Sequence, residues 1–209
     1  YTPADDWIFS RLQTTNKQTH EHIQTYRFDL LAQNLYEFVW HEYCDWYLEF
    51  TKPILTGSDE AVKAETRATT AWVLAQTLRM LHPFMPFVTE ELWSQFGFSD
   101  KLLIAESWPD YGAPLQDAAI DEISWLVELI TAVRSLRAEL RVNPAEKIRL
   151  LLGDAKGDVA GRIVRNKDLI ERLARVVDPA VTTEAAPKGA VATVIRDATV
   201  ILPLAGVID

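Results

Sequence analysis

One stretch, residues 30–55, constrains the fold more than any other part of the chain. It reads LLAQNLYEFVWHEYCDWYLEFTKPIL, and its aromatic side chains are far denser than the chain average of 10%. At the helical rotation of about 100° per residue, its apolar side chains share one face. These are Ala32, Leu35, Tyr36, Val39, Tyr43, Trp46 and Phe50. The pattern predicts a helix that other elements cover on several sides, because its apolar arc exceeds the roughly 100° of an ordinary surface helix.

The ends of this helix and its single cysteine follow from local rules. Asp29 precedes the first periodic residue and is the expected N-cap, and Pro53 is expected to end the helix. Cys44 is expected to be a small buried thiol. A lone cysteine cannot form an internal disulfide and fits a reducing compartment.

Glu42 lies at the edge of the apolar face. A carboxylate in that position is costly unless it is paired, so the sequence predicts an arginine partner. Arg79, Arg134 and Arg137 are the candidates for this partner.

Further helices are predicted on both sides of the aromatic stretch. They cover residues 3–26, 59–81, 86–96 and 117–141, with an irregular connection at residues 98–115. Thr2 and Pro3 give the first helix a strong start, and Ser58 is expected to cap the third helix. Pro86 and Gly97 mark the ends of the short fourth helix, whose expected buried side is formed by Phe87, Leu92, Trp93 and Phe96.

The pattern changes after Pro144. Residues 147–153 are typical of a strand, residues 158–177 of a helix that is broken near Asn166, and two β-branched runs at 190–195 and 199–204 of a hairpin. We therefore expect a mainly α fold: an antiparallel helical bundle at residues 1–143 and a small α+β subdomain at residues 144–209.

The composition of the chain narrows the range of possible functions. The net charge of −9 argues against gripping nucleic acid by bulk electrostatics. No apolar run is long enough to span a membrane and no signal peptide is recognisable, so we expect a cytoplasmic protein without a membrane partner. His41 and Cys44 could form half of a zinc site, but no second pair of soft ligands is present, and we expect no bound metal.

Basic residues are concentrated in two stretches, residues 134–149 and 162–175. By composition alone, each stretch is better explained as a solvent-exposed charged face than as a nucleic-acid binding site. Charge alone does not decide between these two interpretations.

Several motifs are more specific: WIFSRL, LYEFVWHEYCDWYLEFTKPIL, LHPFMPFVTEELW, SLRAELRVNPAEKIRLLL and the terminal VILPLAGVID. In these motifs the chain resembles the C-terminal part of the valyl-tRNA synthetases, a class Ia family, over essentially its whole length. HPFMPFVTEELW also marks the isoleucine and leucine enzymes, whereas CDWYLE, RAELRVNP and PLAG together point to valine.

The resemblance implies an anticodon-binding helical bundle of the class Ia type, followed by a small α+β piece that precedes a coiled-coil arm. The family's His-Ile-Gly-His and Lys-Met-Ser-Lys-Ser signatures, which hold ATP in the catalytic domain, are not in this sequence. We therefore expect part of a larger valine–tRNA ligase that joins valine to tRNA(Val) using ATP. This part would be monomeric, would bind no cofactor and would contribute no catalytic residue.

The resemblance also implies that the first helix and neighbouring loops read the anticodon. Amides and guanidinium groups can hydrogen-bond unstacked bases, and aromatic rings can stack on them. The candidate tRNA-binding residues are Arg11, Gln13, Asn16, Lys17, Arg27 and Phe28, with Arg137 and Arg141 as candidates for backbone contact.

Two alternatives remain open. One is the same domain of an isoleucyl- or leucyl-tRNA synthetase, which an exchange of anticodons would distinguish. The other is a helical protein-interaction module without RNA affinity, whose binding would be insensitive to salt.

Overall fold

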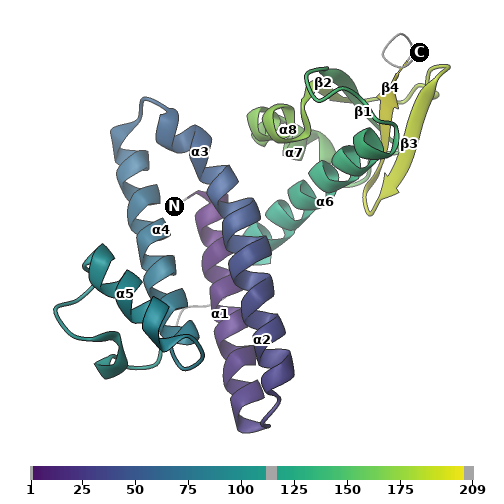
Figure 1. Cartoon of the computed structure of the whole chain (residues 1–209). Coiled ribbons are helices and arrows are strands. Elements are labelled where there is room, and N and C mark those ends of the chain that lie inside the picture. Colours follow the sequence, from purple (N-terminus) through teal and green to yellow (C-terminus); the bar gives the residue numbers. More distant parts are fainter. Residues whose placement is uncertain (1, 112–116, 205–209) are drawn as a thin grey trace. The chain divides into compact units, whose positions relative to one another are not determined.

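The computed structural model describes residues 2–111 and 117–204. Within these residues the fold is mainly α, a helical bundle followed by a small α+β part with a four-stranded sheet, as the sequence predicts (Figure 1). The chain divides into two compact units, Tyr1–Ile120 and Asp121–Asp209. The sequence placed the boundary near Asn143, whereas the structure groups the long helix before Asn143 with the sheet.

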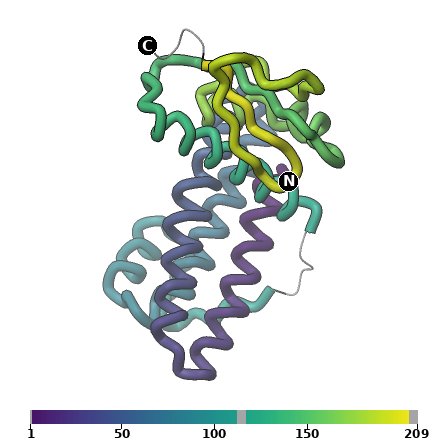
Figure 2. Tube along the Cα trace, turned by 90° about the vertical axis from the view of Figure 1, so that its right-hand side faces the viewer, coloured from purple at the N-terminus to yellow at the C-terminus, as the bar shows by residue number. Residues whose placement is uncertain are grey.

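The first unit contains three long antiparallel helical segments (Figure 2). They are α1 (Pro3–Gln24), a continuous rod made of α2 (Phe28–Tyr36), the π-helix η1 (Glu37–Tyr47) and α3 (Leu48–Thr56), and α4 (Glu60–Leu81). The predicted start of α1 is confirmed as a reciprocal cap. The Asp5 amide donates to Thr2 Oγ1 at 3.2 Å, and the Thr2 amide donates to Asp5 Oδ2 at 2.9 Å.

The rod confirms the predicted helix but not its predicted buried face. Its inward residues are Leu31, Leu35, Phe38, Tyr43, Tyr47 and Phe50. Ala32 and Tyr36, predicted to be inside, are exposed. The cause is the π-helical segment, in which the Leu48 amide bonds the carbonyl five residues earlier, on Tyr43. This wider turn changes the rotation per residue, so a stripe drawn at a constant 100° drifts away from the face that is buried.

Three local predictions for the rod are wrong. Asp29 lies inside the first turn and Arg27 occupies the N-cap position without a side-chain bond. Pro53 lies within α3, which continues to Thr56. The proline removes one backbone hydrogen bond, but it does so near the end of the rod, where buried Phe50 already holds the helix in place. Cys44 is exposed, because it directly follows the inward-facing Tyr43 and adjacent residues of a helix point in different directions.

The helix α4 begins one residue later than predicted, with Asp59 as its cap. Its carboxylate accepts from the amides of Ala61 and Val62 at 3.0 and 3.1 Å. The helix α5 (Pro86–Phe96) has the predicted bounds, and Gly97 follows it in the left-handed region at φ 65°.

The predicted buried side of α5 is only partly correct. Trp93 is 2% exposed and packs in a small cluster with Ala75, Leu78 and Leu103. Phe87 and Phe96, in contrast, are 90% and 57% exposed, because only one side of this short helix contacts α4.

The connection after α5 is irregular over the residues that are described, apart from the 3₁₀ turn η2 (Leu103–Ala105). Glu90 fixes this turn, since its carboxylate accepts from the amides of Leu103 and Ile104 at 2.7 and 3.3 Å. Part of the predicted connection, residues 112–115, lies outside the described residues.

The second unit combines helices with a mixed sheet. Its elements are α6 (Asp117–Glu139), which begins in the first unit, β1 (Ile148–Gly153), α7 (Val159–Arg165), α8 (Lys167–Ala174), β2 (Val176–Val181), β3 (Ala190–Ile195) and β4 (Ala198–Pro203). The strand order is β2-β1-β4-β3, with β1 and β2 parallel and the other pairs antiparallel. The predicted first strand, the helix break at Asn166 and the final hairpin are confirmed.

The strand β2 was not predicted, since the sequence extended the helix to Val177. The helix instead ends at Ala174, because Arg175 adopts a left-handed conformation at φ 54°. Val176 is fully buried and pairs with Ile148 of β1. With Asp178 and Pro179 in its middle, β2 has a weak local strand signal, so its conformation depends on pairing with β1, which local sequence does not reveal.

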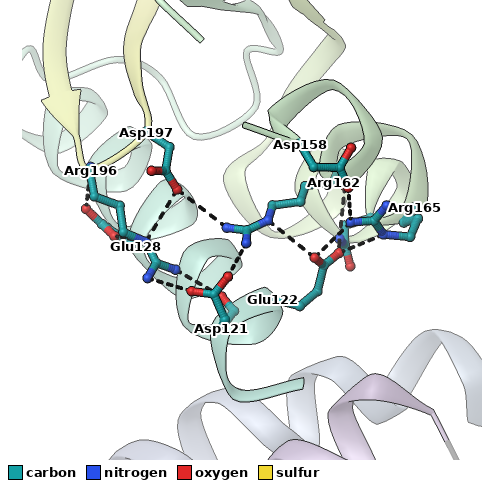
Figure 3. A network of polar contacts seen from close by, with 9 residues as sticks. Asp121, Glu122, Glu128, Asp158, Arg162, Arg165, Arg196 and Asp197 are labelled. Carbon is teal, nitrogen blue, oxygen red and sulfur yellow. Dashed lines mark hydrogen bonds and ion pairs between the residues drawn. The ribbon is translucent and has the colours of Figure 1, made fainter. Parts of the chain in front are cut away.

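A network of ion pairs ties α6 to α7 and to the β3–β4 turn (Figure 3). Arg196 Nη1 lies 2.9 Å from Asp121 Oδ1, and Arg165 Nη2 lies 3.0 Å from Glu122 Oε2. Arg162 also contacts Asp121. These bonds give a physical reason why α6 belongs to the unit that contains the sheet.

Candidate nucleic-acid interface

Arg11 projects from α1 toward the rod and pairs with Glu42. Its Nε donates to Glu42 Oε1 at 2.8 Å, and its Nη2 lies 2.6 Å from the same oxygen. The predicted arginine partner of Glu42 therefore exists, but the three named candidates were wrong. Arg79 contacts Glu106 at 3.0 Å instead, and Arg137 donates to backbone carbonyls. Arg11 and Glu42 lie 31 positions apart in the chain, and no local pattern indicates that Glu42 faces the first helix.

Asn16 joins α1 to the connection that follows α5. Its Nδ2 donates to the carbonyl oxygen of Pro109 at 2.9 Å, and its Oδ1 accepts from Trp108 Nε1 at 2.8 Å. Both ends of the amide are thus engaged within the first unit. Gln13, one turn earlier, is 9% exposed, whereas Lys17 is exposed. Of these three candidates from α1, Lys17 is the one whose side chain is open to a partner.

The turn between α1 and α2 presents a fixed cation beside two rings. Arg27 donates to both carboxylate oxygens of Asp29, from Nε at 2.9 Å and from Nη2 at 2.7 Å. Its hydrogen bond lowers the pKa of Asp29 to about 2. Tyr26 and Phe28 on either side are 80% and 52% exposed, and their rings meet edge to face at 6.4 Å. The predicted residues Arg27 and Phe28 are therefore brought together on the surface.

A second exposed aromatic pair lies further along the same rod. Tyr36 and Trp40 are 56% and 54% exposed, and their rings are stacked at 6.3 Å with an interplanar angle of 7°. Sequence reasoning assigned Tyr36 to the core and named neither ring as a binding candidate. The available signal is that Trp40 does not belong to the predicted apolar face of the helix, which indicates partial exposure of its ring. We call Tyr26, Phe28, Tyr36 and Trp40 the rod aromatics.

The two arginine candidates of the second unit, Arg137 and Arg141, differ in solvent exposure. Arg137 is 7% exposed and donates to three carbonyl oxygens, those of Arg175, Asn143 and Glu146, at 3.1, 3.1 and 2.8 Å. It therefore holds the chain that leaves α6. Arg141 is exposed and has a left-handed backbone at φ 51° just after that helix.

The basic stretch at residues 162–175 is partly neutralised. Figure 3 shows Arg162 and Arg165 directed at carboxylates, and Arg165 Nη2 also lies 2.9 Å from Asp158 Oδ2. Together with Arg196, these side chains are committed to the fold. Ion pairs with carboxylates therefore engage these arginines in bracing the second unit.

Within residues 2–111 and 117–204, no group of three or more His, Cys, Asp or Glu side chains is placed to hold a metal ion. In the same part of the chain, none of the helices combines the length and apolarity needed to cross a membrane.

Comparison with known proteins decides the family. A family model described as the anticodon-binding domain of tRNA ligase matches residues 5–152. The chain belongs to this family. The match begins in α1 and ends in β1, so the α1 candidates and the rod aromatics all lie inside the matched domain.

Curated relatives of this anticodon-binding domain carry the name valine–tRNA ligase. That of Zymomonas mobilis is 45% identical over 208 residues, that of Mesorhizobium japonicum 44% over 207 residues, and that of Caulobacter vibrioides 43% over 212 residues. These alignments cover 97%, 97% and 99% of this chain. The chain spans only 22–23% of the length of these relatives.

Proposed function

We propose that this chain is the anticodon-binding region of a valine–tRNA ligase and that it holds the anticodon end of tRNA(Val). The observation that carries the proposal is the identity of 43–45% to valine–tRNA ligases over 97–99% of the chain. In the whole enzyme, a cytoplasmic monomer in this proposal, valine would be joined to tRNA at the expense of ATP. That chemistry would occur in a domain outside this chain.

The rod aromatics support an RNA-binding role. A splayed base of an RNA loop has an aromatic face, and stacking on an exposed ring stabilises it by roughly 1–3 kcal/mol. The Tyr26–Phe28 and Tyr36–Trp40 pairs offer such rings on the rod and on the turn that leads into it. Lys17 supplies positive charge on α1, and the Arg27 guanidinium, held by Asp29, offers a planar group beside the first ring pair. Short-range contacts of this kind do not require a basic chain overall.

The other predicted residues take a different part in this proposal. Arg11, Gln13 and Asn16 are engaged or buried within the bundle. In this proposal they hold the RNA-binding surface in position and do not contact the RNA themselves. Their bonds fix α1 against the rod and against the connection after α5. The anticodon contacts are assigned to Lys17, Arg27 and the rod aromatics.

A titration of the 209-residue chain with tRNA(Val) tests the proposal. Fluorescence anisotropy would follow labelled tRNA(Val), the same tRNA with a replaced anticodon, and tRNA(Ile). We expect tighter binding to tRNA(Val) than to either comparison RNA and an affinity that falls as salt rises. Equal binding of all three RNAs would overturn the anticodon assignment, and preference for tRNA(Ile) would favour the isoleucine enzyme.

One observation favours a second function, binding of another protein surface. Phe87 is 90% exposed, and Phe84 and Met85 before it are 43% and 48% exposed. Neighbouring apolar side chains that are exposed at the surface are typical of a protein–protein interface. This alternative predicts no RNA binding in the titration, together with association that salt does not weaken.

A further inference from the structure

A hollow in the second unit is lined by three arginines. It has a volume of about 320 Å³ and lies where the end of α6, the loop after it and the end of α8 meet. The lining residues are Arg134, Arg137, Ala138, Val142, Pro144, Leu173, Ala174 and Arg175. Three of these carry a positive charge, and none of the lining residues just named is acidic. Such a lining is unusual in a chain whose net charge is −9.

Backbone carbonyls hold all three guanidinium groups in place. Arg134 Nε donates to the Leu173 oxygen at 2.9 Å, and Arg175 Nη1 donates to the Pro144 oxygen at 2.7 Å. Arg137 donates to three carbonyls, one of them that of Arg175. A carbonyl orients a guanidinium but carries no net charge, so these bonds fix Arg137 and Arg175 without neutralising them. Arg162 and Arg165 of the same unit, in contrast, face carboxylates.

The positive charges act on one another. Burial lowers the pKa of Arg137, and the charge of Arg175 lowers it further, while Glu146 opposes this. Like charges held together favour an anion between them. The apolar side chains of Ala138, Val142 and Leu173 reduce screening and strengthen such an interaction. The planar guanidinium group also matches the geometry of a phosphate, which it can bind through two parallel hydrogen bonds.

We propose that this hollow binds a phosphate group. Where the phosphate belongs to the backbone of a tRNA, the inference rests on the proposed function and adds a contact in the second unit to those of the bundle. A free phosphate has the same chemistry and would occupy the same place. Arg175 is the residue that reaches the ligand from the exposed rim, and Arg137 supplies buried charge behind it. The exposed Arg141 lies next to the lining residue Val142.

The first experiment measures tRNA(Val) affinity of the 209-residue chain as a function of salt. Arg175→Gln removes the rim charge, Arg175→Lys keeps the charge without the planar fork, and Arg172→Gln is the matched control, since Arg172 is an exposed arginine of α8 outside the hollow. We expect Arg175→Gln to weaken binding roughly tenfold, the effect of one charged hydrogen-bonded contact. The slope of log affinity against log salt should decrease by about one, with partial recovery in Arg175→Lys.

The second experiment titrates inorganic phosphate while NMR follows the arginine Nε–H signals. We expect the signals of Arg137 and Arg175 to move and those of Arg172 to stay, with the movement lost in Arg175→Gln. Thermal unfolding of every variant checks that the fold is retained. If Arg175→Gln unfolds, the phosphate titration of the wild-type chain decides alone.

The outcomes separate the two proposals. Phosphate-induced shifts without any tRNA binding would support the hollow and refute the proposed function. Normal tRNA binding in Arg175→Gln, together with no phosphate-induced shifts, would overturn the hollow and leave the proposed function standing. Shifts with phosphate but unchanged tRNA affinity in Arg175→Gln would assign the hollow to a free phosphate.

Discussion

Arg11 and Glu42 form a two-point contact between the first helix and the π-helical centre of the rod, with both Nε and Nη2 of the arginine within 2.8 Å of one carboxylate oxygen. The side chains are 33% and 20% exposed. Removing one partner leaves the other charge partly buried without compensation, which costs more than the intact pair contributes. The contact therefore makes Arg11 a structural residue of the bundle.

Arg11→Ala should consequently destabilise the chain by about 1–3 kcal/mol, the cost of a partly buried group that loses its bond. Urea unfolding of Arg11→Ala, Glu42→Ala and the double variant would measure this. We expect the double variant to lose less than the sum of the single variants by at least about 0.5 kcal/mol. Strict additivity would show that the pair contributes nothing.

Asn16→Ala should also lower stability, because the indole N–H of Trp108 and the Pro109 carbonyl both lose their bond to the amide. We expect a loss of about 1–3 kcal/mol in the free energy of unfolding. Lys17→Ala, one position later and exposed, is the control and should change stability by no more than about 0.5 kcal/mol. For tRNA binding we expect the opposite order. Expressed per folded molecule, the affinity for tRNA should fall more in Lys17→Ala than in Asn16→Ala.

Trp40→Ala should separate binding from folding. Its ring is 54% exposed, so we expect a small change in unfolding free energy and a loss of roughly 1–3 kcal/mol in tRNA affinity. Trp93→Ala, at a site 2% exposed, should cost about 3–5 kcal/mol of stability. Unchanged tRNA affinity in Trp40→Ala, measured by the same titration, would remove this ring from the proposed surface.

Acid should weaken the second unit through Glu122. Burial alone would raise the pKa of this carboxyl, but hydrogen bonds from Arg165 and Asn166 outweigh burial, and the pKa lies below the ordinary value of 4.5. A lowered pKa in the folded state gives stability that is present above the unfolded-state value and is lost as the pH falls through the folded-state value. The loss should therefore appear below about pH 4.5.

Thermal unfolding of the wild type and Glu122→Gln between pH 6 and pH 3 would test this. We expect the wild type to be the more stable at pH 6 and the difference to shrink as the pH falls. Glu139→Gln, which removes an exposed carboxylate of α6, serves as the control. A difference that does not change with pH would contradict the role of the Glu122 charge.

Cys44 should react with a thiol reagent in the folded chain, because its side chain is exposed. Partial burial and the neighbouring Asp45 raise the pKa of the thiol. Since the thiolate is the reactive form, labelling should be slower than in the unfolded chain and should accelerate as the pH rises. Labelling that requires denaturant would show instead that the thiol is buried.

The helices, their caps and the final hairpin could be predicted from the sequence because they depend on residues a few positions apart. The reciprocal cap of Thr2 and Asp5, the left-handed Gly97 and the break at Asn166 are of this kind. The motifs likewise sufficed to indicate the family. In each case the chemistry that produces the feature is local.

Only the tertiary structure decided which surface is available. The π-helix turned Tyr36 outward and Tyr47 inward, the partner of Glu42 came from a helix 31 positions away, and the amide of Asn16 met Trp108 across 92 positions. The strand β2 and the hollow at Arg175 depend in the same way on distant segments. Periodicity and capping are set by neighbours along the chain, whereas exposure and pairing are set by whatever the completed fold brings alongside.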